Sequence, residues 1–248
     1  MSEDDFSSSL KDASAKDRIG FVKKVYSILF SQLLFTAVCI AATITIEDLA
    51  NWMFINWWPL IPAFITVIFT EIMMLCVKPL RRKVPINYIL LFLFTLAEAY
   101  IVSWICMSYS LQVECNEYGY DCTYNFQNRE PIIAAATGTV AITAACTAYA
   151  CTTKTDFTAK WGIIFVAGMA FFILSLFGLI FYDRIFQMMI ATLGVFLFGV
   201  YLIFDTQLVM GGKRYQLSID DFIVGALILY LDIIMIFLYL LQIFGGRG

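Results

Sequence analysis

The sequence contains no histidine, and charged side chains make up only 14% of its 248 residues. Without an imidazole, the chain lacks a common metal ligand and the usual base of a Ser-His or Cys-His catalytic pair. A formal net charge of −3 leaves no basic excess with which to bind nucleic acid. These absences argue against a His-based enzyme and a nucleic-acid partner. They leave carboxyl groups as the means of any pH sensing near neutrality.

The chain is instead rich in apolar residues, at 61% against about 45–50% in soluble domains. A bilayer core about 30 Å thick needs roughly 20 apolar residues per helix. Seven segments qualify: residues 25–46, 60–77, 86–109, 132–151, 161–182, 185–210 and 222–244. We predict an all-α membrane protein with seven transmembrane helices in one domain, 21–248. A polar, acidic and disordered cytosolic tail, 1–20, precedes it.

Lys and Arg predict the orientation of the chain. Thirteen of the 16 basic residues fall in the tail and in the second, fourth and sixth loops. Because cytosolic loops are enriched in Lys and Arg, the N-terminus is predicted to be cytosolic. An odd number of helices then places the C-terminus on the other side of the membrane.

The seven cysteines fall into two groups. Five lie in or at the ends of apolar segments, where cysteine acts as a small hydrophobe. Cys115 and Cys122 instead lie in the third loop, on the side predicted to be non-cytosolic. If that side is oxidising, we expect a disulfide between them.

Four acidic residues fall well inside apolar segments, although a charge there costs about 2.5–3.5 kcal/mol. They are Glu71, Glu98, Asp205 and Asp232. No Lys or Arg lies equally deep, so simple ion pairs do not account for them. Each acid is either neutral and hydrogen-bonded in a packed interior or part of an ion route, and both interpretations stay open.

Asp205 and Asp232 lie on the sixth and seventh segments, which a short loop joins into antiparallel neighbours. Asp205 stands roughly 8 Å before the end of its helix, and Asp232 roughly 15 Å into the next. A modest vertical offset would bring the two side chains level. Two carboxyl groups that meet in a low-dielectric interior would share a proton, which makes a pH switch without histidine.

Four runs of the sequence match a pattern known from one membrane-protein family. They are FVKKVYSIL at 21–29 followed by QLL at 32–34, TLAEA at 95–99, FDTQ at 204–207 and LYLDII at 229–234. Together with the number and spacing of the helices, these runs resemble the Bax inhibitor/lifeguard family, and most closely its lifeguard branch. Phe204 replaces that family's usual Tyr, which removes a hydroxyl beside Asp205.

The resemblance implies a fold of two three-helix layers around a central C-terminal helix. It implies a pH-sensitive calcium leak with an anti-apoptotic role in an intracellular membrane. The endoplasmic reticulum or Golgi is favoured over the plasma membrane or the mitochondrial inner membrane. The implied pH sensor is Asp205 with Asp232, and the arginine that interacts with them is Arg81 or Arg82. Glu71 and Glu98 are similar to acidic positions of the family and would line the ion route.

The chemistry of calcium agrees with such a route. Calcium prefers several oxygen ligands, so Asp205 and Asp232 would give it a weak metal site. Weak binding suits conduction, because an ion that enters must also leave. The expected partners are calcium as the permeant ion, the lipid bilayer and other membrane proteins of cell-death control. No cofactor and no enzymatic activity are expected.

Three other classes of protein compete with this interpretation. An intramembrane aspartyl protease also carries aspartates on its sixth and seventh helices. Here, however, Leu229-Tyr230-Leu231 precedes Asp232 in place of the required glycines. A seven-helix receptor is disfavoured because the Asp-Arg-Tyr and Asn-Pro-x-x-Tyr patterns are absent. An accessory subunit of a larger membrane complex stays open, because the apolar helices of a chain with 17% aromatic residues would suit packing against partners.

Overall fold

The computed structural model describes residues 15–115 and 122–246. Its long helices are α1 (Ala15–Thr45), α3 (Leu60–Cys76), α5 (Ile86–Ser110), α6 (Glu130–Thr152), α7 (Trp161–Gly178), α8 (Arg184–Met210) and α9 (Phe222–Phe244). Its short elements are α2 (Glu47–Ile55), α4 (Lys78–Arg82), β1 (Gln112–Cys115), β2 (Cys122–Asn125) and the 3-10 turns η1 (Thr158–Lys160) and η2 (Ile219–Asp221). The described chain is therefore helical apart from one two-stranded hairpin.

Six of these helices are long and apolar enough to cross a membrane, and the pair of α2 and α3 supplies a seventh crossing if it counts as one span. The pair is bent by 87° at its break. Pro59 stands immediately before α3, where its missing N–H removes no helical hydrogen bond. The predicted all-α membrane fold is confirmed, and the predicted count of seven crossings agrees with these helices.

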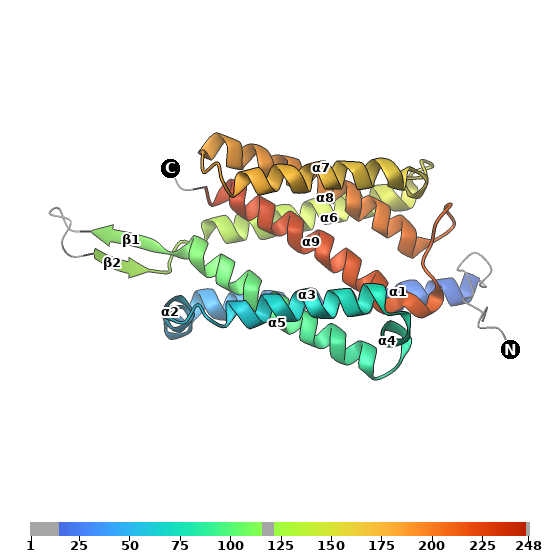
Figure 1. Cartoon of the computed structure of the whole chain (residues 1–248), viewed down its shortest axis with the longest axis horizontal. Helices are drawn as coiled ribbons and strands as arrows, with labels where there is room; N and C mark the ends of the chain where they lie inside the picture. Colours follow the sequence, from blue (N-terminus) through green and yellow to red (C-terminus); the bar gives the residue numbers. More distant parts are fainter. Residues whose placement is uncertain (1–14, 116–121, 247–248) are drawn as a thin grey trace.

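The helix α9 lies at the centre, between a layer of α1, α3 and α5 and a layer of α6, α7 and α8 (Figure 1). It packs against α8 and α6 on one side and against α1 and α5 on the other. Within its most apolar window 72% of the residues are buried, against 11% for α7 on the outside. A helix that is apolar all round buries itself in this way. The predicted arrangement of two layers around the last helix is confirmed.

The ends of α8 show how local sequence sets the bounds of a helix. The Asp183 carboxylate accepts a hydrogen bond from the Phe186 backbone N–H at 3.1 Å, as a helix cap does. At the other end, Gly211 has a φ of 73°, a left-handed conformation that glycine adopts without steric strain. The segments predicted at 185–210 and 222–244 accordingly match α8 and α9 to within one residue.

Two parts of the structure differ from the prediction. The helix α1 begins at Ala15, inside the range 1–20 assigned to a disordered tail, and continues without a break to buried Phe21. Residues 1–14 of that tail lie outside the described residues. The helix α2 lies between the predicted segments 25–46 and 60–77, and it forms because Ala50 and Met53 pack against Met107 of α5.

The hairpin of β1 and β2 lies in the loop that carries the two predicted disulfide cysteines. Its antiparallel register places Cys115 directly opposite Cys122. Opposite residues in such a pair have Cα atoms about 4.5–5.5 Å apart, a range that disulfides also span. The side chains of both cysteines lie outside the described part of the chain, so the disulfide stays a prediction.

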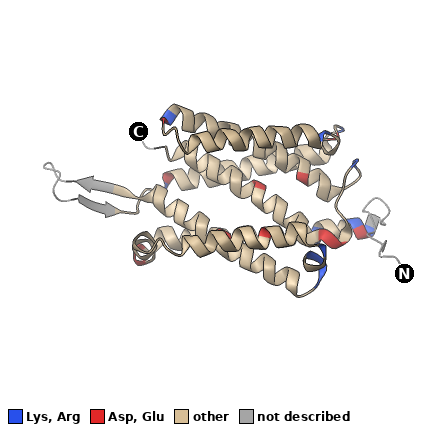
Figure 2. Cartoon of the chain, viewed as in Figure 1, with Lys and Arg blue, Asp and Glu red and all other residues tan. Residues whose placement is uncertain are grey.

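Basic residues gather at the end of the bundle where α1 begins (Figure 2). The same end holds α4 and the connections after α6 and α8. At the opposite end, which carries α2 and the hairpin, the described basic residues are Arg129 and Arg184. The charge asymmetry along the sequence is therefore a polarity of the folded molecule, from one end of the helices to the other.

Candidate functional site

Asp205 on α8 and Asp232 on α9 meet inside the bundle. The two helices pack along each other, and the two aspartate side chains interact directly. Asp232 is 5% exposed, and Asp205 is partly exposed. The structure therefore brings together the two residues that the sequence singled out.

One carboxyl oxygen of this pair has no hydrogen-bond donor. Asp232 Oδ2 is buried without a partner among the described residues. Tyr201 lies close enough to act electrostatically on both aspartates, but its hydroxyl donates to the Ile164 carbonyl at 3.2 Å. A buried acceptor without a donor is unfavourable, and a proton held between the two carboxyl groups would supply one. The arrangement thus suits a single proton shared by two acids.

Glu98 on α5 and Glu71 on α3 form a second acidic pair, on helices that also pack along each other. Glu98 is 9% exposed, Glu71 is partly exposed, and the two lie within electrostatic range of each other. The four acids that the sequence placed inside apolar segments therefore form two pairs. Glu71 and Glu98 lie within the layer of α1, α3 and α5, and Asp205 and Asp232 lie where α8 meets α9.

The helix α9 carries one member of the first pair and also lies close to the second. Tyr230 and Asp232 are two residues apart, so at 3.6 residues per turn they lie on nearly opposite faces of α9. The Tyr230 hydroxyl lies 2.9 Å from Thr36 Oγ1 on α1, and Glu98 is within electrostatic range of it. Asp232 faces α8 instead. A movement of α9 would consequently change the surroundings of both acidic pairs.

Arg81 and Arg82, at the end of α4, both bind Asp221, the last residue of η2. Nε and Nη2 of Arg81 lie 3.0 and 3.1 Å from the two carboxylate oxygens. The same atoms of Arg82 lie 2.9 and 3.1 Å from them. Each contact is a two-point fork, the strongest geometry for this kind of pair. The hydrogen bond to Asp221 is also the main cause that raises the pKa of Arg82.

This contact corrects the expectation that Arg81 or Arg82 interacts with Asp205 and Asp232. Asp221 precedes Asp232 by eleven residues, which is about 16 Å along α9. Sequence reasoning gave Asp221 no role as the partner of these arginines, although two signals pointed to it. Adjacent arginines at a membrane edge need an acidic partner, and an acid is favoured at the start of a helix. The pairing joins residues 140 positions apart, and nothing local in the sequence specifies it.

The described residues offer no group of three or more Cys, Asp or Glu side chains arranged to hold a metal ion. Asp205 and Asp232 supply a pair of carboxyl groups, whereas calcium in a stable site takes six to eight oxygens. A resident metal centre therefore finds no support among the described residues.

The fold and the site together define a class of protein. It is a multi-pass α-helical membrane protein in which a buried acid of the central C-terminal helix pairs with an acid of the neighbouring helix. A family model described as "Inhibitor of apoptosis-promoting Bax1" matches residues 18–248. The chain belongs to this family.

Curated relatives agree with the match. Protein lifeguard 3 of Homo sapiens is 30% identical over 237 residues, which cover 94% of this chain and 70% of the human protein. Protein lifeguard 3 of Mus musculus is 31% identical over 236 residues, with 94% and 71% covered. Protein lifeguard 4 of Mus musculus is 32% identical over 247 residues, with 97% and 91% covered. The resemblance to the lifeguard branch is confirmed.

Proposed function

We propose that this protein suppresses apoptosis by acting as a pH-sensitive calcium leak in an intracellular membrane. The description of its family names an inhibitor of an apoptosis-promoting protein, which supports the cellular role. The direct contact between Asp205 and Asp232 supports the mechanism, because two carboxyl groups that touch at low dielectric can share a proton.

The proposed sensor works through the charge of the aspartate pair. With one shared proton, the two carboxyl groups attract each other and hold α8 against α9. When that proton leaves, two like charges face each other at low dielectric and the contact between the helices weakens. The ionised oxygens then provide a weak, transient binding site for calcium, and Glu71 with Glu98 provides a second such site.

Calcium flux through liposomes that contain the pure full-length protein, across about pH 5 to 8, tests this mechanism. Asp205→Asn and Asp232→Asn keep the shape and a hydrogen bond but leave one titrating acid, so each should abolish the wild-type pH dependence. Glu71→Gln and Glu98→Gln should change the rate of flux more than its pH midpoint. Asp48→Asn, at an exposed acid on α2, is the matched control and should behave as wild type.

Two outcomes would contradict the proposal in different ways. If both aspartate variants keep the wild-type pH dependence, the pair is structural and the sensor lies elsewhere. If the pure protein carries no calcium at any pH but is recovered in fixed stoichiometry with other membrane proteins, it is an accessory subunit. In that case the large apolar side chains exposed on the outer helices would serve as packing surface for those partners.

We also propose that the N-terminus is cytosolic and that the protein resides in the endoplasmic reticulum or Golgi. The gathering of basic residues at the end where α1 begins supports this orientation. Membership in a family described by its effect on apoptosis supports an intracellular membrane.

A further inference from the structure

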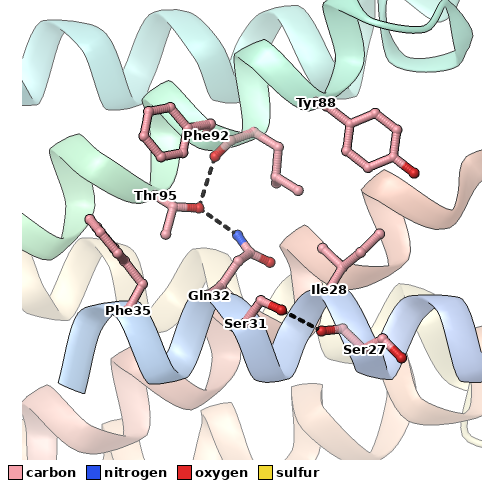
Figure 3. Close-up of a pocket in the computed structure, with 9 residues that line it drawn as sticks. Ser27, Ile28, Ser31, Gln32, Phe35, Tyr88, Phe92 and Thr95 are labelled. Atoms are coloured by element: carbon pink, nitrogen blue, oxygen red, sulfur yellow. Dashed lines mark hydrogen bonds between the residues drawn. The ribbon is translucent and has the colours of Figure 1, made fainter. Parts of the chain in front are cut away.

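A groove of about 450 Å³ lies between α1 and α5 on the outside of the bundle (Figure 3). Gln32, Leu91 and Thr95 are the buried residues of its lining, whereas Ser31 and Phe92 are exposed. Its volume falls in the range of about 300–1,000 Å³ that is usual for small-molecule sites. Because it opens between two membrane-spanning helices, the lipid phase has direct access to it.

Gln32 carries a buried acceptor without a donor in this groove. The side chain is 5% exposed, and Nε2 donates to Thr95 Oγ1 at 2.8 Å. The Thr95 hydroxyl donates to the Leu91 carbonyl at 2.8 Å, so Thr95 must accept from Gln32. This fixes the orientation of the amide and leaves Gln32 Oε1 buried and unpartnered. A ligand that donates a hydrogen bond would satisfy it.

Two serines extend the same chemistry toward the basic end of α1. The hydroxyl of Ser31 donates to the Ser27 carbonyl at 2.9 Å, and that of Ser27 donates to the Lys23 carbonyl at 2.7 Å. The hydroxyl proton of each serine is therefore already engaged in a hydrogen bond, whereas its oxygen can still accept one. Ser27, Ser31 and Gln32 span about 7.5 Å along α1, and together they present three acceptors.

The groove is too short for a partner helix, and its lining carries no cation for a phosphate. The rings of Phe35 and Phe92, 6.4 Å apart between centroids, stand at one end. Ser27 to Phe35 is only about 12 Å along the helix, whereas a spanning helix follows about 30 Å. The nearby cation of Lys24 lies over the Phe222 ring at 3.3 Å. An anionic headgroup would meet serine and glutamine acceptors on α1.

We propose that this groove binds an uncharged lipid of the ceramide class, which carries one amide N–H and two hydroxyls on an apolar body. Its three donors match the three acceptors of α1, and its chains match the apolar remainder of the groove. A sterol or a diacylglycerol carries a single hydroxyl and would leave two acceptors unmatched. Phosphatidylcholine carries no donor in its headgroup.

A second groove on the same molecule serves as an internal control. It has a volume of about 550 Å³ and is lined by α8 with Leu174 of α7. Thr192 is the one polar residue in its lining, and its hydroxyl donates to the Met188 carbonyl at 2.8 Å. The two grooves are similar in size and in access to lipid, but only the α1–α5 groove contains an unpartnered amide oxygen among the described residues.

The test is photolabelling of the full chain in phosphatidylcholine nanodiscs with a trace of a photoreactive ceramide, followed by mapping of the labelled peptides. Label should fall on residues 27–35 and 88–95 in preference to 185–193. Gln32→Leu and Ser31→Ala should each reduce it about fivefold to tenfold, the effect of one lost hydrogen bond to the lipid. Thr192→Val should leave it unchanged.

Competition identifies the lipid. Unlabelled ceramide should displace the label, whereas a sterol or diacylglycerol at the same mole fraction should not. Equal labelling of both grooves, or equal competition by all three lipids, would overturn the proposal. If Gln32→Leu proves unstable by thermal unfolding, Ser31→Ala decides the matter, because Ser31 is exposed and its hydrogen bond lies within α1. The outcome does not depend on calcium flux.

Discussion

Asp221 is a single carboxylate that holds two guanidinium groups, and its side chain is only 6% exposed. The arginines are more open, at 16% for Arg81 and 30% for Arg82. Removal of the acid leaves both guanidinium groups without their carboxylate partner, whereas removal of one arginine leaves the other ion pair in place. The three residues therefore differ sharply in what each contributes to joining α4 to the start of α9.

Asp221→Asn should destabilise the protein by about 2–4 kcal/mol, somewhat less than the loss of one partner from a fully buried pair because the arginines reach solvent. Arg81→Gln or Arg82→Gln alone should cost about 1 kcal/mol or less. Thermal unfolding in detergent measures the difference. Asp220→Asn, at the exposed neighbour, is the control and should be nearly neutral. Equal effects of the Asp220 and Asp221 variants would show that the double fork contributes nothing.

Asp156 is the acid that links the connection after α6 to the connection after α8. It accepts hydrogen bonds from the Thr158 hydroxyl at 2.6 Å and from the backbone N–H of Arg214 at 3.1 Å. Partial burial acts to raise the pKa of Asp156, but these hydrogen bonds, led by that of Thr158, outweigh it and hold the pKa below the ordinary 3.8. The link is therefore complete while this carboxylate is ionised.

A depressed pKa in the folded state stabilises the protein above the ordinary pKa, and the effect is lost as pH falls through the folded value. Asp156→Ala should accordingly lower the midpoint of thermal unfolding at neutral pH. The gap between wild type and variant should close as pH falls below about 4. Midpoints recorded from pH 7 to pH 3 provide the measurement. A gap that is constant with pH would mean that the carboxylate charge plays no part in the link.

Among the helices, α8 and α9 owe their close approach to a glycine. A Cβ built on Gly194 of α8 would lie 2.6 Å from the ring of Tyr239 on α9. An aromatic ring packed between two helices cannot retreat as a flexible chain end would, so the helices themselves would have to separate. This contact lies on the same pair of helices that carries Asp205 and Asp232.

Gly194→Ala should therefore destabilise the protein by about 1–3 kcal/mol, the usual effect of overpacking. It should also weaken the pH dependence of flux by moving the two aspartates apart. Gly20→Ala on α1 is the matched control, because a Cβ there meets nothing within 4 Å. At that exposed helical position alanine should stabilise by up to about 1 kcal/mol. Thermal unfolding of both variants tests whether the first lowers and the second raises the stability of the protein.

Elements with a strong local signal could be predicted from sequence, and those that depend on tertiary contact could not. The helix α9 has an unbroken apolar run, and α8 lies between a capping aspartate and a glycine pair. The helix α2 lacks such signals, since it forms where Met53 packs against α5 and reaches Phe126 after the hairpin. The strands of the hairpin have only four residues each, and a sequence pattern that short does not distinguish a strand from coil.

The same division applies to the site. The meeting of Asp205 with Asp232 could be predicted because a short loop makes α8 and α9 neighbours and helix geometry sets the depth of each residue. The pairing of Glu71 with Glu98 and the partner of Arg81 depend on how separate helices pack. The unpartnered oxygen of Gln32 depends on a hydrogen bond between α1 and α5 that joins residues 63 positions apart.

At the scale of the whole molecule, the polarity of charge makes a prediction about topology. Sealed microsomes that contain the protein with a tag at either end should lose the N-terminal tag to added protease and keep the C-terminal one. The physical reason is that the basic end of the bundle stays on the cytosolic side. A protected N-terminal tag would reverse the orientation and move the cysteine hairpin to the cytosol, where a disulfide is not expected.

The bend between α2 and α3 has a consequence for where the protein can reside. The helix α3 has 17 residues and α7 has 18, lengths of about 26 and 27 Å. At the bend, the exposed side chains of Trp52, Trp57 and Trp58 are suited to the headgroup region and would keep α3 from sliding inward. The bilayer of the endoplasmic reticulum is about 27 Å thick in its hydrocarbon part, and that of the plasma membrane about 32–33 Å. Hydrophobic mismatch at these two helices would therefore be larger at the cell surface, and we expect it to favour thin intracellular membranes.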